Sequence, residues 1–265
     1  MLSSIILQLS AKENGRIHGS TGRAVHGLWY QQWQKTFPVL ANVLHQVNGH
    51  QPFTLSPMMG LPTPQRGVVT VRQGDTAWLR FTTLHPEVTQ RTLETWLPSL
   101  PGTIELAGTR WHLQNIALMP QEHPYAGQTS YQTLEETTKP EKTWCFSFQT
   151  PTTFHIGKDA YLPFPLPGAL VNSWWRRWHT FAPRQLPPLD LKLLHDQLFV
   201  SHYQLKTVPV RHGRRLIIGC VGKITLRAGK LPPETCHTIT TLARYATYCG
   251  SGKHTTQGMG LTIAD

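Results

Sequence analysis

The sequence predicts an α+β fold made of two tandem units with the same order of strands and helices. Segments with strand or helix character follow the order βαββαβ twice, and a polar stretch with Pro, Gly and Thr at 120–142 separates the two series. This order is the split βαβ arrangement of ferredoxin-like domains. A length of 265 residues suits two small domains. We therefore expect an N-terminal domain at 1–125 and a C-terminal domain at 140–265.

The first series begins and ends with an apolar strand. Pro86 fits the first turn of a helix, where its missing N–H has no partner to lose. In chain order we expect a strand at 3–10, helices at 23–35 and 37–47, strands at 53–58, 68–72 and 76–84, a helix at 86–97 and a strand at 110–118.

The second series repeats this order with longer strands. Its first helix starts at a proline and its second ends at a glycine, both of which are ordinary helix boundaries. In chain order we expect a strand at 143–150, a helix at 167–182, a hairpin of 199–210 with 214–229, a helix at 232–250 and a last strand within 258–264.

The composition favours a polyanionic partner. Lys and Arg total 25 against 14 acids, for a net charge of +11, which suggests nucleic acid first and an anionic membrane second. No stretch approaches the roughly 20 apolar residues of a membrane span. The four cysteines lack metal-ligand spacing, there is no HExxH, and the N-terminus does not resemble a signal peptide. We expect a reduced, cytoplasmic protein without a metal or other cofactor.

One face of the first helix carries candidate catalytic groups. On a helical wheel, Arg23, His26 and Tyr30 lie together at spacing i, i+3, i+7, opposite an apolar side with Trp29 and Trp33. An imidazole base and a cation are sufficient for RNA cleavage by the adjacent 2′-hydroxyl. An ordinary solvated polar face remains the alternative. His45, at the edge of the next apolar helix face, is a second candidate base.

The C-terminal stretch YCGSGKHTTQGMG, 248–260, is rich in glycine and cationic. It is not a P-loop, because Thr247 stands where the first glycine belongs, and it lacks the third glycine of a dinucleotide fingerprint. A long turn with glycines at positive φ is the simplest structural explanation.

This loop and two further regions carry a resemblance to a known family. The other regions are HGLWYQQWQ with FPVLANVLHQVNGHQPFTLSPMMG, and FQTPTTFHIG with FPLPGALVNSWWRRWHTFAP. They resemble the CRISPR-associated endoribonucleases that cut repeat RNA into guide RNAs, the sixth Cas family. The resemblance implies two ferredoxin-like domains and CRISPR repeat RNA as the partner. It also admits other Cas effector subunits and a second copy of the chain as partners.

The resemblance implies a role for particular residues. His45 matches members whose catalytic histidine follows a leucine, with Tyr30 fifteen residues earlier; Gln51 stands where those members have a lysine. His26 matches members that use a histidine of the first helix, and Arg23 is the nearest substitute for the missing cation. The resemblance and the basic character of the segments imply RNA-binding roles for Arg176, Arg177, Gly250, Gly252, Lys253, His254, Gly258 and Gly260. The tryptophans beside the two arginines are spaced for the core instead.

Two alternatives to the nuclease come from different classes. One is a non-catalytic RNA-binding protein of the same fold, although no RNP-like run is present. The other is a structural subunit that only docks on other Cas proteins. RNA cleavage and RNA binding distinguish the three hypotheses.

Overall fold

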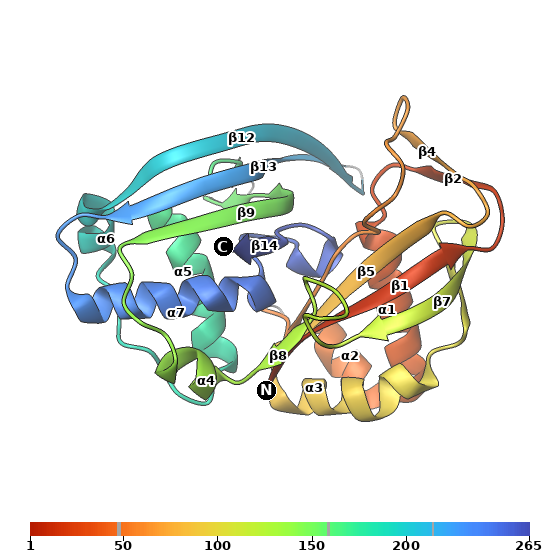
Figure 1. Cartoon of the computed structure of the whole chain (residues 1–265), viewed down its shortest axis with the longest axis horizontal. Helices are drawn as coiled ribbons and strands as arrows, with labels where there is room; N and C mark the ends of the chain where they lie inside the picture. The colour runs from red at the N-terminus through yellow and green to blue at the C-terminus, as the bar shows by residue number, and fades with distance from the viewer. Residues whose placement is uncertain (47–48, 158–159, 214) are drawn as a thin grey trace. The chain divides into compact units, whose positions relative to one another are not determined.

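The computed structural model describes residues 1–46, 49–157, 160–213 and 215–265, without the side chains of His45, Gln46 and His212. It consists of two compact units, shown in Figure 1. Unit 1 comprises Met1–Gln128 with Thr256–Gly258, and unit 2 comprises Thr129–Thr255 with Met259–Asp265. A three-residue piece of the C-terminal loop therefore belongs to the N-terminal unit, which the sequence did not indicate.

The main sheet of unit 1 has the ferredoxin-like strand order. Strand β1 (Leu2–Ala11) lies between β5 (Thr76–Thr83) and β7 (Thr109–Ala117), and β3 (Phe53–Leu55) pairs with the far side of β5. All of these pairs are antiparallel. Strand β6 (Thr103–Leu106) extends the sheet beyond β7, and β8 (Gly127–Thr129) also pairs with β1.

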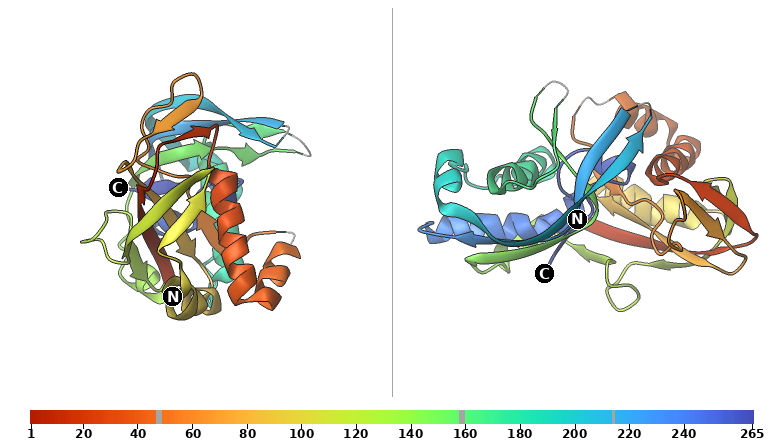
Figure 2. Two further views of the ribbon diagram at one scale, coloured as in Figure 1. Left: turned by 90° about the vertical axis from the view of Figure 1, so that its right-hand side faces the viewer. Right: turned by 90° about the horizontal axis from the view of Figure 1, so that it is seen from above.

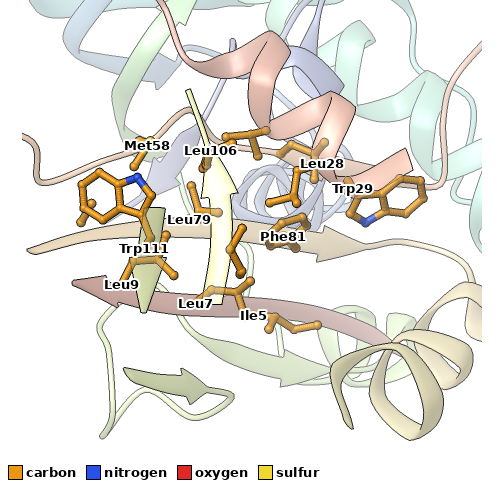
Figure 3. Close-up of a cluster of buried hydrophobic side chains, with 14 of the residues drawn as sticks. Ile5, Leu7, Leu9, Leu28, Trp29, Met58, Leu79, Phe81, Leu106 and Trp111 are labelled. Atoms are coloured by element: carbon orange, nitrogen blue, oxygen red, sulfur yellow. The ribbon is translucent and has the colours of Figure 1, made fainter. Parts of the chain in front are cut away.

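The helices of unit 1 cover one face of this sheet, as Figures 1 and 2 show. Their apolar sides meet alternate residues of the strands, because successive strand residues point to opposite faces. Figure 3 shows this core, where Ile5, Leu7 and Leu9 of β1 lie beneath Leu28 and Trp29. The helices are α1 (Gly22–Thr36), α2 (Pro38–Gln46) and α3 (Pro86–Arg91), the last continued by a π turn (Thr92–Trp96) and a 3₁₀ turn (Leu97–Ser99).

One expected strand of unit 1 is present but pairs elsewhere. Strand β4 (Val68–Val71) forms a separate two-stranded sheet with β2 (Gly15–His18), a strand that the sequence did not predict. An apolar run of this length identifies a strand without identifying its partner.

Unit 2 has the same arrangement as unit 1. Its sheet runs β12 (Leu198–His212), β13 (Arg215–Ala228), β9 (Thr143–Thr152), β14 (Thr262–Ala264), all antiparallel. Helices α5 (Pro167–Phe181) and α7 (Pro233–Cys249) pack on one face of it (Figure 1). Two short strands, β10 (Phe154–His155) and β11 (Tyr161–Leu162), form a small hairpin. The prediction of an α+β fold with tandem ferredoxin-like units is confirmed.

Two short helices correct the sequence analysis. The stretch 120–142, expected to be a linker, contains α4 (Tyr131–Glu136), which begins at the capping side chain of Ser130 and buries Tyr131 and Leu134. Helix α6 (Leu191–Gln197), capped by Asp190, was also missed. Neither helix is long enough for its apolar period to repeat. No helix of the described segments is long and apolar enough to cross a membrane.

Candidate active site

Helix α1 is amphipathic in the way that the wheel predicted. Its apolar side is buried, and the ring of Trp29 lies 3.9 Å from that of Phe53 and 4.6 Å from that of Trp33, centroid to centroid. This packing fixes the rotation of the helix. Arg23 is consequently exposed on the other side, while His26 and Tyr30 are half-buried there.

The ring of His26 is held by a carbonyl of the C-terminal loop. Nδ1 of His26 lies 2.8 Å from the backbone oxygen of Thr256, a residue of the same unit. A carbonyl oxygen only accepts hydrogen bonds, so Nδ1 must carry a proton. In the neutral ring, Nε2 is then the nitrogen that can take a proton, and the contact both orients the imidazole and selects its tautomer.

Tyr30 lies next to this imidazole. The ring centroids of His26 and Tyr30 are 4.8 Å apart. Burial raises the pKa of the Tyr30 phenol to about 12, because the phenolate is poorly solvated there. The phenol therefore keeps its proton near neutral pH and can donate a hydrogen bond to an anion.

Arg23 adds a positive charge to the same face. It stands one helical turn before His26, and its side chain is exposed. Arg23 forms no ion pair with any residue within the described segments. An anion can therefore reach its guanidinium without displacing a carboxylate.

The side-chain contacts of His45, the second candidate base, are not described, so they cannot be compared with those of His26. His45 stands in the last turn of α2, and its side chain lies outside the described residues. Its role stays a prediction. Gln51, which stands at the position of the expected lysine, is half-buried.

The glycines of the C-terminal loop allow close backbone packing. Gly250, Gly252, Gly258 and Gly260 all have positive φ, between 65° and 87°. A Cβ added at Gly252 would lie 2.1 Å from the oxygen of Thr153, and one at Gly260 would lie 2.1 Å from the oxygen of Ser251. The turn with positive-φ glycines, weighed as the simplest explanation, accounts for these positions.

The amides of this loop are used within the protein. The N–H groups of Ser251, Gly252, Lys253 and Gly260 donate to Gly260 O, Ser173 Oγ, Thr153 O and Pro151 O, at 2.8 to 3.0 Å. The resemblance implied an RNA-binding role for the glycines of this loop, and these internal bonds argue against direct contact of the bonded N–H groups with phosphates. The exposed side chain of Lys253 and the half-buried His254 remain candidate RNA contacts.

The two arginines of α5 occupy different environments. Arg176 is exposed, as an RNA contact requires. Arg177 is only 5% exposed, and its guanidinium donates to Gly252 O at 2.6 Å and to Ser173 Oγ at 2.9 Å. Arg177 therefore supports the glycine loop, and its burial corrects the expectation that it binds RNA directly. Trp174 and Trp178 lie in the core, as expected from their spacing.

Two contributors to the site were missed. Thr256 acts through its carbonyl, which has no signature in a sequence. Gly22 begins α1, and a Cβ there would lie 2.1 Å from the oxygen of Gln257. A glycine at the start of an otherwise regular amphipathic helix was the one signal available for this close approach.

Comparisons with known proteins agree with the fold. Residues 146–262 match the family model described as CRISPR-associated endoribonuclease Cas6. A Cas6 product complex is 27% identical, with a TM-score of 0.85 over 100% of both chains. A Thermus thermophilus Cas6 is 26% identical, with a TM-score of 0.78 over 100% of this chain and 98% of the other. A Cas6 substrate mimic complex, 23% identical with a TM-score of 0.78 over 100% and 99%, shares the fold.

The class of protein that the chain is similar to is therefore that of CRISPR-associated endoribonucleases. Residues 146–262 match the Cas6 family, and the whole chain is similar to Cas6 structures, which confirms the resemblance found in the sequence. None of the curated proteins that were searched matches the chain.

Proposed function

We propose that the chain binds CRISPR repeat RNA and cleaves precursor transcripts into guide RNAs, without a metal ion, through attack by the 2′-hydroxyl. The observation that carries the proposal is the α1 face, where Thr256 O holds Nδ1 of His26 at 2.8 Å between Arg23 and Tyr30. An imidazole, a guanidinium and a phenol are groups that move protons and stabilise an anion without a metal.

Each group has a distinct role in the proposed reaction. Nε2 of His26 takes the proton of the 2′-hydroxyl while the 2′-oxygen attacks the adjacent phosphorus. The bond from phosphorus to the 5′-oxygen breaks and this oxygen takes a proton from water, which leaves a 2′,3′-cyclic phosphate upstream and a 5′-hydroxyl downstream. Arg23 stabilises the negative charge that develops on the phosphate oxygens, and Tyr30 donates a hydrogen bond to them.

Several observations support repeat RNA as the substrate. Related Cas6 structures are described as a product complex and a substrate mimic complex. The net charge of +11 suits a polyanion. A second copy of the chain and other Cas subunits as partners rest on the family resemblance and stay predictions. The four cysteines are free, which is typical of proteins in the reducing cytoplasm.

One observation favours the non-catalytic alternative. Gln51 stands where family members with a histidine matching His45 have a lysine. A chain that depends on that arrangement would lack the cation and could bind RNA without cutting it. The arrangement around His26 does not use residue 51.

The test is cleavage of the repeat RNA from the same locus in EDTA, followed by analysis of the ends. We expect cleavage at the rate seen without EDTA, a 5′-hydroxyl on the downstream product and a 2′,3′-cyclic or 3′-phosphate upstream. A downstream 5′-phosphate, or activity that EDTA abolishes, contradicts the mechanism. Tight binding without cleavage supports the alternative.

A further inference from the structure

A row of three side chains crosses the sheet of unit 2 on its outer face. In the strand register, Phe199 of β12 lies opposite Arg227 of β13, which lies opposite Thr143 of β9. Directly opposed residues project to the same face of a sheet. The next row contains Leu226 and Trp144, which are buried.

The buried row identifies which face is which. Nε1 of Trp144 donates to Thr240 Oγ1 of α7 at 2.9 Å, so this row points toward the helices. Alternate strand residues point to opposite faces. Phe199, Arg227 and Thr143 therefore project away from the helices, and Phe199 is 50% exposed there.

The row lines a hollow of about 690 Å³, together with Lys142 and Ser201. This size lies within the range of small-ligand sites. Lys142 and Arg227 are exposed, and neither forms an ion pair with any described residue. The hollow thus combines a half-exposed aromatic ring, two unpaired cations and two hydroxyl groups.

The rim of the hollow is ordered by backbone contacts. Ala228 N donates to Lys142 O, and Gly229 N donates to Gln197 O, each at 2.8 Å. A Cβ at Gly229 would lie 3.1 Å from Cε2 of Phe199, so the ring edge rests against the glycine backbone. The exposed part of the ring is therefore presented in a restricted orientation.

We propose that this hollow is a second RNA-binding site, which takes an unpaired segment of RNA. A base stacks on Phe199, phosphates contact Arg227 and Lys142, and the hydroxyls of Thr143 and Ser201 bond to sugar or base edges. Aromatic rings beside basic side chains on an open sheet face are the groups that bind single-stranded RNA without reading its sequence.

Charge complementarity selects RNA over a protein partner. The cores of protein–protein interfaces are depleted in charged residues, and in lysine in particular, whereas here an unpaired lysine and an unpaired arginine flank the aromatic ring. The inference rests on the proposed function only in taking RNA as the ligand. The described lining of the hollow contains none of the proposed catalytic residues, so the hollow is a different site from the α1 face.

The test is binding of a fluorescent ten-nucleotide oligouridine, which lacks any repeat sequence, to the full chain. Phe199→Leu keeps an apolar side chain but removes the ring; we expect affinity to fall about fivefold or more, and Phe199→Trp to keep it. Tyr203→Leu is the matched control, because Tyr203 lies opposite the buried Ile224 and so projects to the other face. It should leave affinity unchanged.

The charge contribution is tested with Arg227→Ala against Lys192→Ala, an exposed lysine on α6. We expect Arg227→Ala to weaken oligouridine binding and to reduce its salt slope by about 0.7, the single-strand value for one phosphate, and Lys192→Ala to do neither. Photocrosslinking of 4-thiouridine should mark the peptide that contains Phe199.

The outcomes separate this site from the cleavage site. If Phe199→Leu and Arg227→Ala bind oligouridine as the unmodified chain does, the second site is wrong, even when repeat RNA is cut normally. If an acidic protein, and not oligouridine, depends on Phe199, the RNA assignment is overturned. If oligouridine behaves as expected but repeat RNA is bound and not cut, the second site stands and the cleavage proposal fails.

Discussion

At the level of single residues, the open question is whether His26 or His45 is the general base. With the base removed, single-turnover cleavage should fall by ~10²–10⁴ at nearly unchanged RNA affinity. Because Thr256 O fixes its tautomer, we expect this loss for His26→Ala. His112→Ala is the control, since His112 is an exposed residue of the same unit and its Nδ1 bonds Gly102 O. If only His45→Ala lowers the cleavage rate, the base is His45 on α2. If neither variant lowers the rate, neither histidine is the base.

Tyr30 makes a prediction about pH. Burial raises its pKa to about 12, so the phenol stays protonated between pH 6 and 9 and loses its proton only as pH approaches that value. Tyr30→Phe should therefore lower the single-turnover rate roughly 10- to 100-fold, the loss of one hydrogen bond to a charged group, without changing the shape of the pH–rate profile between pH 6 and 9. A limb of the profile that disappears in Tyr30→Phe would show that the phenol titrates in this range.

Arg176 and Arg177 are adjacent, but we expect alanine at Arg176 to weaken RNA binding and alanine at Arg177 to lower stability. Arg177→Ala removes a buried donor from the carbonyl of Gly252, so we expect a loss of about 3 kcal/mol in the free energy of unfolding. Arg176→Ala should change this free energy by less than about 0.5 kcal/mol and weaken RNA binding instead. Denaturant unfolding and RNA titration of both variants measure the two effects. Equal stabilities would show that the guanidinium of Arg177 does not support the loop.

Among the elements, the start of α1 is a point of close backbone contact. Gly22→Ala would place a Cβ 2.1 Å from Gln257 O, so we expect a loss of about 1–3 kcal/mol in stability and slower cleavage, because Thr256 O moves from His26. Gly27→Ala is the matched control in the same helix, with nothing within 4 Å of the added atom. It should stabilise α1 by roughly 0.5–1 kcal/mol. Thermal unfolding and single-turnover cleavage rates measure the two effects. If Gly22→Ala and Gly27→Ala change them equally, the close contact between Gly22 and Gln257 is wrong.

The sequence predicts elements best where apolar residues repeat over several turns. The wheel of α1 correctly separated Trp29 and Trp33 from Arg23, His26 and Tyr30. The same period predicted that the helix at Pro86 continues to residue 97. In the structure its hydrogen bonds change to the π type from Thr92 and to the 3₁₀ type from Leu97. Side-chain period does not report which carbonyl an N–H bonds to.

Contacts between distant segments are what the sequence leaves out. The bond from His26 to Thr256 joins residues 230 positions apart through a main-chain atom, which any residue type could supply. The bond from Arg177 to Gly252 is similar, since it joins residues 75 positions apart, although the i+3 spacing from Trp174 already places Arg177 on the buried side of α5. The sequence therefore predicted the candidate face of α1, but not the hydrogen bonds from distant segments that hold its residues and the glycine loop in place.

For the whole molecule, net charge predicts how RNA binding responds to salt. Each phosphate neutralised by Lys or Arg releases counterions, which lowers affinity as salt rises. If about five phosphates are contacted, log K should fall against log salt with a slope near −3.5 for single-stranded and −4.5 for double-stranded repeat RNA. The excess of 25 basic over 14 acidic residues supplies enough charge for this number of contacts.

Variants of exposed cations test whether that slope comes from particular contacts. Arg176→Ala should reduce its magnitude by about 0.7 to 0.9, the contribution of one phosphate. Lys192→Ala, which removes the same charge from α6, should leave it unchanged, because diffuse attraction between net charges depends little on any one side chain. Lys142→Ala is unsuitable as a control, since Lys142 lines the hollow on the unit 2 sheet. A flat salt dependence would contradict electrostatic binding altogether, and equal slopes for both variants would place the contacted phosphates away from α5.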